Sequence, residues 1–158
     1  MKYHFFWDGP FSQWYSCDII YKDIKFGCAE QAMMYSKAIL FGDEEIAEKI
    51  LNTDNPRSQK ALGRQVRNFD PVLWDQHKFD IVFGINLKKF DQNLDLKETL
   101  LNTDCEYFVE ASPYDTIWGI GLGENDPRIH DESQWRGQNL LGKALDLVKT
   151  TFETIERQ

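Results

Sequence analysis

Apolar side chains change their spacing close to residue 29, and this change separates two kinds of predicted structure. Before it, Ile19–Tyr21 and Ile24–Phe26 flank a short polar turn, which is the pattern of a β-hairpin. After it, apolar positions recur at steps of three and four, which predicts a helix over residues 29–41. Gly42 marks its end, because glycine readily adopts the left-handed conformation that closes many helices.

Most of the remaining chain also shows helical spacing. Asn55 before Pro56, and Asp70 before Pro71, each combine a capping side chain with proline at the first helical position. Further helices are expected at 44–51, 56–66, 71–90, in a short segment capped by Asp95, and at 138–156 with a core stripe of Leu141, Leu145, Val148, Phe152 and Ile155. Strands are expected at 107–111 and 117–122. The sequence therefore predicts a compact α+β fold, mostly α-helical, in a single domain covering residues 1–158.

Composition narrows the classes of function. A chain of 158 residues is long enough to bury a core without disulfides or metals. Its net charge of −8 repels nucleic acid, so non-specific binding to DNA or RNA is not expected. No apolar run has the length of a membrane span, and residues 7–10 (WDGP) interrupt the N-terminal apolar stretch too early for a signal peptide.

Cysteines and histidines give no sign of a metal or redox site. The three cysteines, Cys17, Cys28 and Cys105, have no ligand spacing, and their odd number argues against a disulfide framework. The three histidines are equally scattered. We therefore expect a cytoplasmic protein with reduced thiols, no metal and no cofactor.

Glu30 and Lys37 are the first candidate site residues. An acid in the first turn of a helix is favoured by the helix dipole, which is a sufficient structural explanation for Glu30. Lys37 returns to nearly the same face two turns later, about 10 Å along the axis. A carboxylate and an ammonium facing one cleft suit a substrate with a sugar at one end and a phosphate at the other. Both interpretations are open from these residues alone.

Asp115 is a second candidate acid, and Glu110 competes with it. Asp115 follows Pro113 in a good turn sequence, so a purely structural role would also explain it. Strand alternation places Glu110 opposite Val109, either toward solvent or toward a polar site. Cleavage of a glycosidic bond needs a carboxylate that activates water or stabilises positive charge, and an acid that assists the leaving group.

Aromatic and basic residues offer binding groups. A tryptophan more often belongs to the core than to a ligand platform. Trp14 and Trp118 depart from this mildly, because each lies inside a polar motif, and the use that we propose for them is stacking on a base or a similar ring. A basic stripe is formed by Arg57, Lys60, Arg64 and Arg67, at steps of three and four. Such a stripe is most simply a solvated helix face, and phosphate binding near the helix start is the alternative.

Several motifs together resemble the YbiA-like or NADAR family in the family's order. They are residues 11–15 (FSQWY), 28–34 (CAEQAMM), 40–43 (LFGD), 62–64 (LGR), 69–70 (FD), Trp74, 89–93 (KFDQN), 109–113 (VEASP), 118–121 (WGIG) and 135–145 (WRGQNLLGKAL). The resemblance covers almost the whole chain, from about Phe5 to about Leu147. It implies a compact, largely helical α+β fold and metal-free hydrolysis of the C1′–N bond of a ribosyl group.

The resemblance also implies roles for single residues. Glu30 looks like the family's glutamate and becomes the favoured catalytic residue, with Asp115 assisting. Trp118 and Asn139 match family positions that look polar and site-lining. We therefore expect catalytic Glu30 and Asp115, and substrate-binding Trp14, Lys37, Arg64, Trp118 and Asn139.

The expected partner is a phosphorylated ribosyl or ADP-ribosyl compound. It is either a ribosylamino-pyrimidine phosphate of the riboflavin pathway or an NAD-derived ADP-ribose, free or attached to a macromolecule. One departure is Ala32, where relatives often carry an aromatic residue after the Glu-Gln pair. Because a lost ring beside Glu30 changes the pocket, a non-catalytic module that binds ADP-ribose or a related nucleotide is the alternative function.

Overall fold

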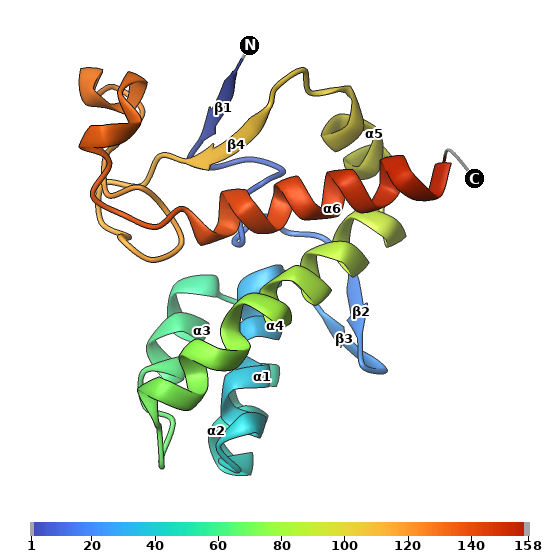
Figure 1. Cartoon of the computed structure of the whole chain (residues 1–158). Coiled ribbons are helices and arrows are strands. Elements are labelled where there is room, and N and C mark those ends of the chain that lie inside the picture. Colours follow the sequence, from blue (N-terminus) through green and yellow to red (C-terminus); the bar gives the residue numbers. More distant parts are fainter. Residues whose placement is uncertain (1, 157–158) are drawn as a thin grey trace. The chain divides into compact units, whose positions relative to one another are not determined.

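The computed structural model describes residues 2–156, whose contacts divide the chain into two compact units. We call Gln13–Leu94 the α1 unit, and the described residues up to Ser12 and from Asp95 onward the β4 unit. Helices dominate both units and the strands are short, so the predicted α+β, mostly helical class is confirmed (Figure 1). No helix within residues 2–156 is both long and apolar enough to cross a membrane.

The α1 unit begins with the predicted hairpin. Strands β2 (Ile19–Tyr21) and β3 (Ile24–Phe26) pair antiparallel, with Ile19 opposite Phe26. Lys22 and Asp23 form the turn with φ values of 51° and 67°. Two positive φ values in succession belong to the type I′ turn, whose twist matches that of the strands.

Helices form the rest of the α1 unit, and local caps fix where they start. They are α1 (Ala29–Leu40), α2 (Glu44–Leu51), α3 (Pro56–Gly63) and α4 (Pro71–Gln92), with α1 packed against the other three (Figure 1). The side chains of Asn55 and Asp70 accept backbone N–H groups at the starts of α3 and α4, as predicted. Asp43 caps α2 in the same way by accepting the Ile46 N–H.

Helix α3 is shorter than the expected span of 56–66. It ends at Gly63, and Arg64 is the C-cap residue. The Arg67 N–H and guanidinium both bind Asp43, at 2.9 and 2.7 Å, and Asn68 has a φ of 61°. Because Asp43 and Asn68 direct the chain away from the helical path, Arg67 does not continue the basic stripe on α3.

The β4 unit contains a parallel strand pair that the sequence pattern did not predict. Strand β1 (Tyr3–Phe6) pairs with β4 (Tyr107–Glu110), with Phe6 opposite Glu110. Helix α6 (Leu140–Glu156) packs on β4 and buries Leu141, Leu145, Val148 and Phe152. Ile155 was expected in the same stripe but is exposed, because it lies in the last turn of α6. Helix α5 (Leu94–Asn102) begins at Leu94, so Asp95 lies in its first turn and is not its cap.

The expected strand at 117–122 is wrong. This segment is a loop in which Gly121 has a φ of 72°, and the N–H groups of Arg136 and Asn139 donate to the carbonyls of Ile120 and Gly119. A Cβ at Gly119 would lie 2.9 Å from the Glu110 carbonyl oxygen. The glycines therefore permit a close approach of backbones, and the apolar side chains between them, such as Ile120, fill a small core with Val109.

Candidate functional site

Glu30 lies at the start of α1, and its side chain is almost fully enclosed. The residue is 6% exposed. Cys28 occupies the N-cap position without a side-chain hydrogen bond to the helix. The Glu30 N–H instead donates to the Gln13 carbonyl at 2.9 Å. A backbone contact from a distant segment thus satisfies a donor that lacks an intrahelical partner at this position.

Gln31 fixes the same helix start and was not singled out from the sequence. Its Oε1 accepts the Gly27 N–H at 2.8 Å. Its Nε2 lies 3.1 to 3.3 Å from the carbonyl oxygens of Ile50, Leu51 and Thr53 at the end of α2. The signal available in the sequence was a glutamine that follows Glu30 among small and apolar residues. Gln31 therefore ties the turn that carries Glu30 to the C-terminal end of α2.

Lys37 reaches from α1 toward α3 and α4. Its Nζ donates to the Gly63 carbonyl at 2.8 Å and lies 4.6 Å from the centroid of the Phe69 ring and 5.9 Å from that of Trp74. Burial lowers the pKa of the Lys37 ammonium. The Glu30 carboxylate raises this pKa and so opposes the shift, whereas the Arg64 guanidinium lowers the pKa further. The charges of Glu30 and Arg64 thus both act on the Lys37 ammonium, and all three predicted residues belong to one unit.

The other predicted residues of the α1 unit lie at its surface. Arg64 is exposed at the end of α3. Trp14 directly follows Gln13 and is 42% exposed, as a stacking platform requires. Trp74 was quoted only as part of a family motif, yet it is buried beside Lys37. Ala32 is fully buried, so its small side chain belongs to the packing of α1.

Asp115 lies in the β4 unit and holds its own turn together. Its Oδ1 accepts the N–H groups of Ile117 at 2.9 Å and Trp118 at 2.8 Å. The Asp115 N–H donates to the Ser112 hydroxyl at 3.0 Å. The carboxylate is half-buried and has a structural role, and its role in catalysis stays a prediction.

Asn139 and Glu110 meet at strand β4. The Asn139 Oδ1 accepts the Glu110 N–H at 3.0 Å, and its Nδ2 donates to the Phe108 carbonyl at 3.0 Å. Asn139 has a φ of 54°, a left-handed conformation that asparagine tolerates better than most residues. Its amide therefore anchors the start of α6 to β4, and its role in binding stays a prediction. Trp118, whose side chain is half-buried, also stays a predicted binding residue.

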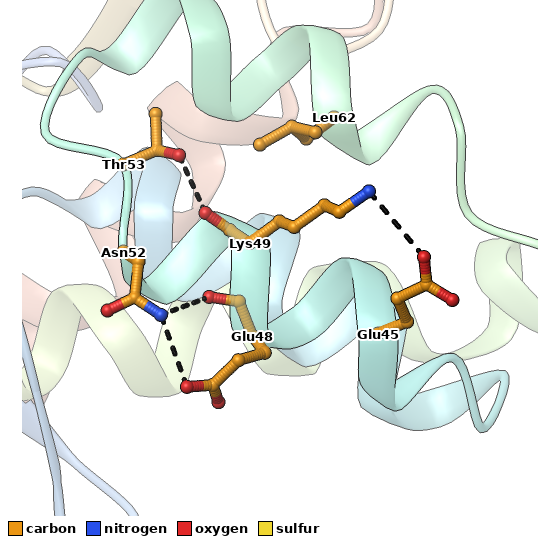
Figure 2. Close-up of a pocket in the computed structure, with 6 residues that line it drawn as sticks. All are labelled: Glu45, Glu48, Lys49, Asn52, Thr53 and Leu62. Atoms are coloured by element: carbon orange, nitrogen blue, oxygen red, sulfur yellow. Dashed lines mark hydrogen bonds and ion pairs between the residues drawn. The ribbon is translucent and has the colours of Figure 1, made fainter.

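A surface hollow of about 580 Å³ lies between α2 and α3 (Figure 2). It is lined by Glu45, Glu48, Lys49, Asn52, Thr53 and Leu62. Its charged groups are engaged with their neighbours, as the Lys49–Glu45 ion pair at 3.5 Å shows. None of the predicted site residues lines this hollow.

No cluster of three or more His, Cys, Asp or Glu side chains within residues 2–156 has the geometry of a metal site. The side chains of the predicted site residues offer acid–base and electrostatic chemistry. A carboxylate beside an ammonium of lowered pKa can orient water, stabilise positive charge or bind an anion.

A sequence profile of the NADAR domain matches residues 5–153. The chain belongs to the NADAR family. The matched span includes both units and all seven predicted site residues. The resemblance inferred from the motifs is thus confirmed.

Two curated relatives support this membership. The chain is 47% identical to Protein irg-1 of Caenorhabditis elegans over 135 residues, which cover 84% of the chain and 64% of that protein. It is also 47% identical to N-glycosidase R617 of Acanthamoeba polyphaga mimivirus over 146 residues, covering 88% of the chain and 85% of that protein. The NADAR chain therefore spans most of R617 but less than two thirds of irg-1.

A solved structure supports the fold. The E. coli protein YbiA, determined by NMR, superposes with a TM-score of 0.82 over 99% of this chain and 88% of its own, at 22% sequence identity. The predicted YbiA-like fold is thus confirmed.

Proposed function

We propose that this chain is an N-glycosidase that hydrolyses the C1′–N bond of a phosphorylated ribosyl or ADP-ribosyl compound. The enzyme class is supported by the high identity to a relative named as an N-glycosidase. The observation that carries the proposal in this chain is the enclosed Glu30 carboxylate at the start of α1, whose charge raises the pKa of Lys37 on the same helix. Together they provide a carboxylate for the sugar and a cation for an anionic group of the substrate.

The reaction adds water across the glycosidic bond. The C1′–N bond breaks, the water oxygen forms a bond to C1′, and the departing nitrogen receives a proton. Glu30 orients the water and stabilises the oxocarbenium-like state, in which positive charge develops at C1′. Because the Gln13 carbonyl and the Gln31 amide hold the start of α1, the carboxylate is presented from a fixed backbone.

The remaining predicted residues take supporting roles in this proposal. Asp115 assists the chemistry, and Trp14 and Trp118 stack on the base or the ribose. Lys37 and Arg64 bind phosphate, for which a cationic side chain is suited. Asn139 binds hydroxyl groups through the part of its amide that its two backbone hydrogen bonds leave unused.

The test is a substrate panel with mass-spectrometric detection of the free base and the ribosyl product. The panel contains ribosylamino-pyrimidine phosphates, NAD, and ADP-ribosylated peptide and nucleic acid. Wild type is compared with Glu30→Gln and with Glu44→Gln, a first-turn glutamate of α2 that is exposed. We expect release by wild type and Glu44→Gln, and none by Glu30→Gln.

Full activity of Glu30→Gln would refute the catalytic assignment. If no compound is hydrolysed and ADP-ribose raises the melting temperature, the chain is a binding module. Release from a single member of the panel would identify the substrate class.

A further inference from the structure

Helix α4 presents polar side chains on a buried face, where helices usually present apolar ones. Asn86 and Lys89 are both fully buried, one turn apart on this helix. The Lys89 Nζ lies 5.7 Å from the centroid of the Tyr15 ring. This face belongs in part to the family motif at 89–93, to which the proposed reaction gives no role.

The C-terminal end of α4 is bonded to strand β2 and to the residue just before that strand. The side chain of Gln92 accepts the Ile20 N–H and donates to the Ile20 carbonyl, both at 2.7 Å. Asn93 donates to the Asp18 carbonyl at 3.0 Å. Together with Asn86 and Lys89, these groups contact the chain at positions between Gln13 and Ile20.

Asn86 makes the contact at the Gln13 end. Its Nδ2 donates to the Gln13 Oε1 at 2.9 Å and to the Val82 carbonyl at 2.8 Å. Asn86 is 0% exposed and Gln13 is 8% exposed. The Asn86 Oδ1 is buried without a hydrogen-bond partner among the described residues. Because an unpaired buried acceptor is unfavourable, stability alone does not account for an amide at this position.

Gln13 connects this amide to the candidate active site. Its backbone carbonyl accepts the Glu30 N–H at 2.9 Å, at a helix start that receives no side-chain cap from Cys28. The bonds run from Asn86 on α4, through Gln13, to the peptide group of Glu30. Each link lies within the α1 unit.

We propose that Asn86 is a positioning residue for Glu30. Asn86 fixes the side chain of Gln13, and the Gln13 carbonyl then fixes the helix start that presents the carboxylate. This inference rests on the proposed function insofar as it concerns turnover. A carboxylate displaced by about 1 Å from its reactive geometry can lose about 100-fold in rate.

The test compares Asn86→Leu on α4 with Asn93→Leu at the C-cap of that helix. Asn93 is the control, because it is also an asparagine, but its amide donates to two backbone carbonyls, those of Asp18 and Lys89, and not to Gln13. We expect kcat to fall by about 10- to 100-fold in Asn86→Leu, with KM changed by less than about twofold. Asn93→Leu retains its turnover at temperatures where it is folded. Equal turnover in the two variants would overturn the proposal.

A second measurement does not depend on any substrate. Hydrogen exchange followed by NMR reports whether the Glu30 N–H is still held by Gln13. In Asn86→Leu we expect this amide to exchange at least about tenfold faster, while the Gly27 amide, held by Gln31, keeps its rate. An unchanged Glu30 amide would overturn the positioning role. If wild type hydrolyses nothing but this exchange accelerates, the proposed function fails and the structural link stands.

Gln13→Met provides the remaining arm. This variant keeps the backbone carbonyl but removes the acceptor for Asn86. If Asn86→Leu does not fold, Gln13→Met tests the same hydrogen bond from its other end. Because both residues act through one hydrogen bond, the double variant should lose no more turnover than either single variant. Additive losses would show that the two residues act independently, which would contradict the proposal.

Discussion

The two acids predicted to act in catalysis occupy turns that are held in opposite ways. At the start of α1, the Glu30 N–H is bound by Gln13, and Gln31 joins the same turn to α2. In the 112–118 turn, the Asp115 carboxylate is itself the acceptor that holds two backbone N–H groups. A substitution at Asp115 is therefore expected to lower both stability and turnover. A substitution at Glu30 is expected to lower turnover and to leave stability nearly unchanged.

The largest expected effect is the loss of turnover in Glu30→Gln. We expect kcat to fall by about 1,000-fold or more, because the amide cannot act as a base or stabilise positive charge. The melting temperature should change by only a few degrees, since the helix start is held by other residues. Turnover and thermal unfolding of the same sample check this. If the activity is lost only because the variant unfolds, then stability and turnover do not change independently at Glu30, and the contrast with Asp115 is wrong.

Lys37→Met should have the next largest effect. The variant keeps an apolar stem against Phe69 and Trp74 but removes the charge beside Glu30. We expect kcat/KM to fall by about 10- to 100-fold, which corresponds to about 1.4 to 2.7 kcal/mol. Lys49→Met on α2 is the control, because Lys49 makes only an exposed ion pair with Glu45. Equal kcat/KM values for wild type and Lys37→Met would show that Lys37 does not belong to the site.

Asp115 can be tested with a pair of substitutions that separates its two roles. Asp115→Ala removes the acceptor of the turn and should lower the free energy of unfolding by about 1 kcal/mol, as for other capping side chains. Asp115→Asn keeps an oxygen in the place of Oδ1 and should restore most of this stability. Denaturant unfolding and turnover of both variants are the measurements. Restored activity in Asp115→Asn would show that Asp115 is structural only.

The smallest expected effect is on how stability changes with pH. Two buried or bonded acids contribute slopes of opposite sign. In the β4 unit, burial raises the pKa of Asp146 to about 6, although its carboxylate accepts the Phe108 N–H. The folded protein therefore holds a proton that the unfolded chain releases, so stability falls as the pH rises from about 4 to about 6. After allowance for solvent screening, the change is about 1 kcal/mol. Asp146→Asn should remove this slope.

Asp43 in the α1 unit provides the contrast. Its hydrogen bonds from Arg67 hold the pKa of this carboxyl well below its usual range. Its contribution to stability is therefore present above about pH 4, the unfolded value, and is lost as the pH falls below it. Urea unfolding between pH 3 and pH 7 measures both slopes. A slope at pH 4–6 that survives in Asp146→Asn would contradict the assignment to Asp146.

Some of the candidate site could be predicted because its signals are local. Glu30 and Lys37 lie seven residues apart on one helix, and the Glu30 charge raises the pKa of Lys37. Gln31 and Asn86 could not be assigned in the same way, because their partners lie at distant positions in the chain. The predicted basic stripe is wrong at Arg67, because the Arg67 guanidinium donates to Asp43, which lies outside α3.

The sequence by itself determined the hairpin and the starts of α3 and α4. In these elements, the turn residues or the capping oxygen lie within about three positions of the groups that they fix, so the signal is contained in a short window. Only the tertiary structure decided that β4 pairs with β1 and that 117–122 is a loop. Strand β1 lies about a hundred residues before β4, and the run of apolar residues in β4 does not identify its partner. Backbone N–H and C=O groups are the same in every residue, so they pair with whichever segment tertiary packing places beside them. The periodicity of side chains does not specify which segment that is.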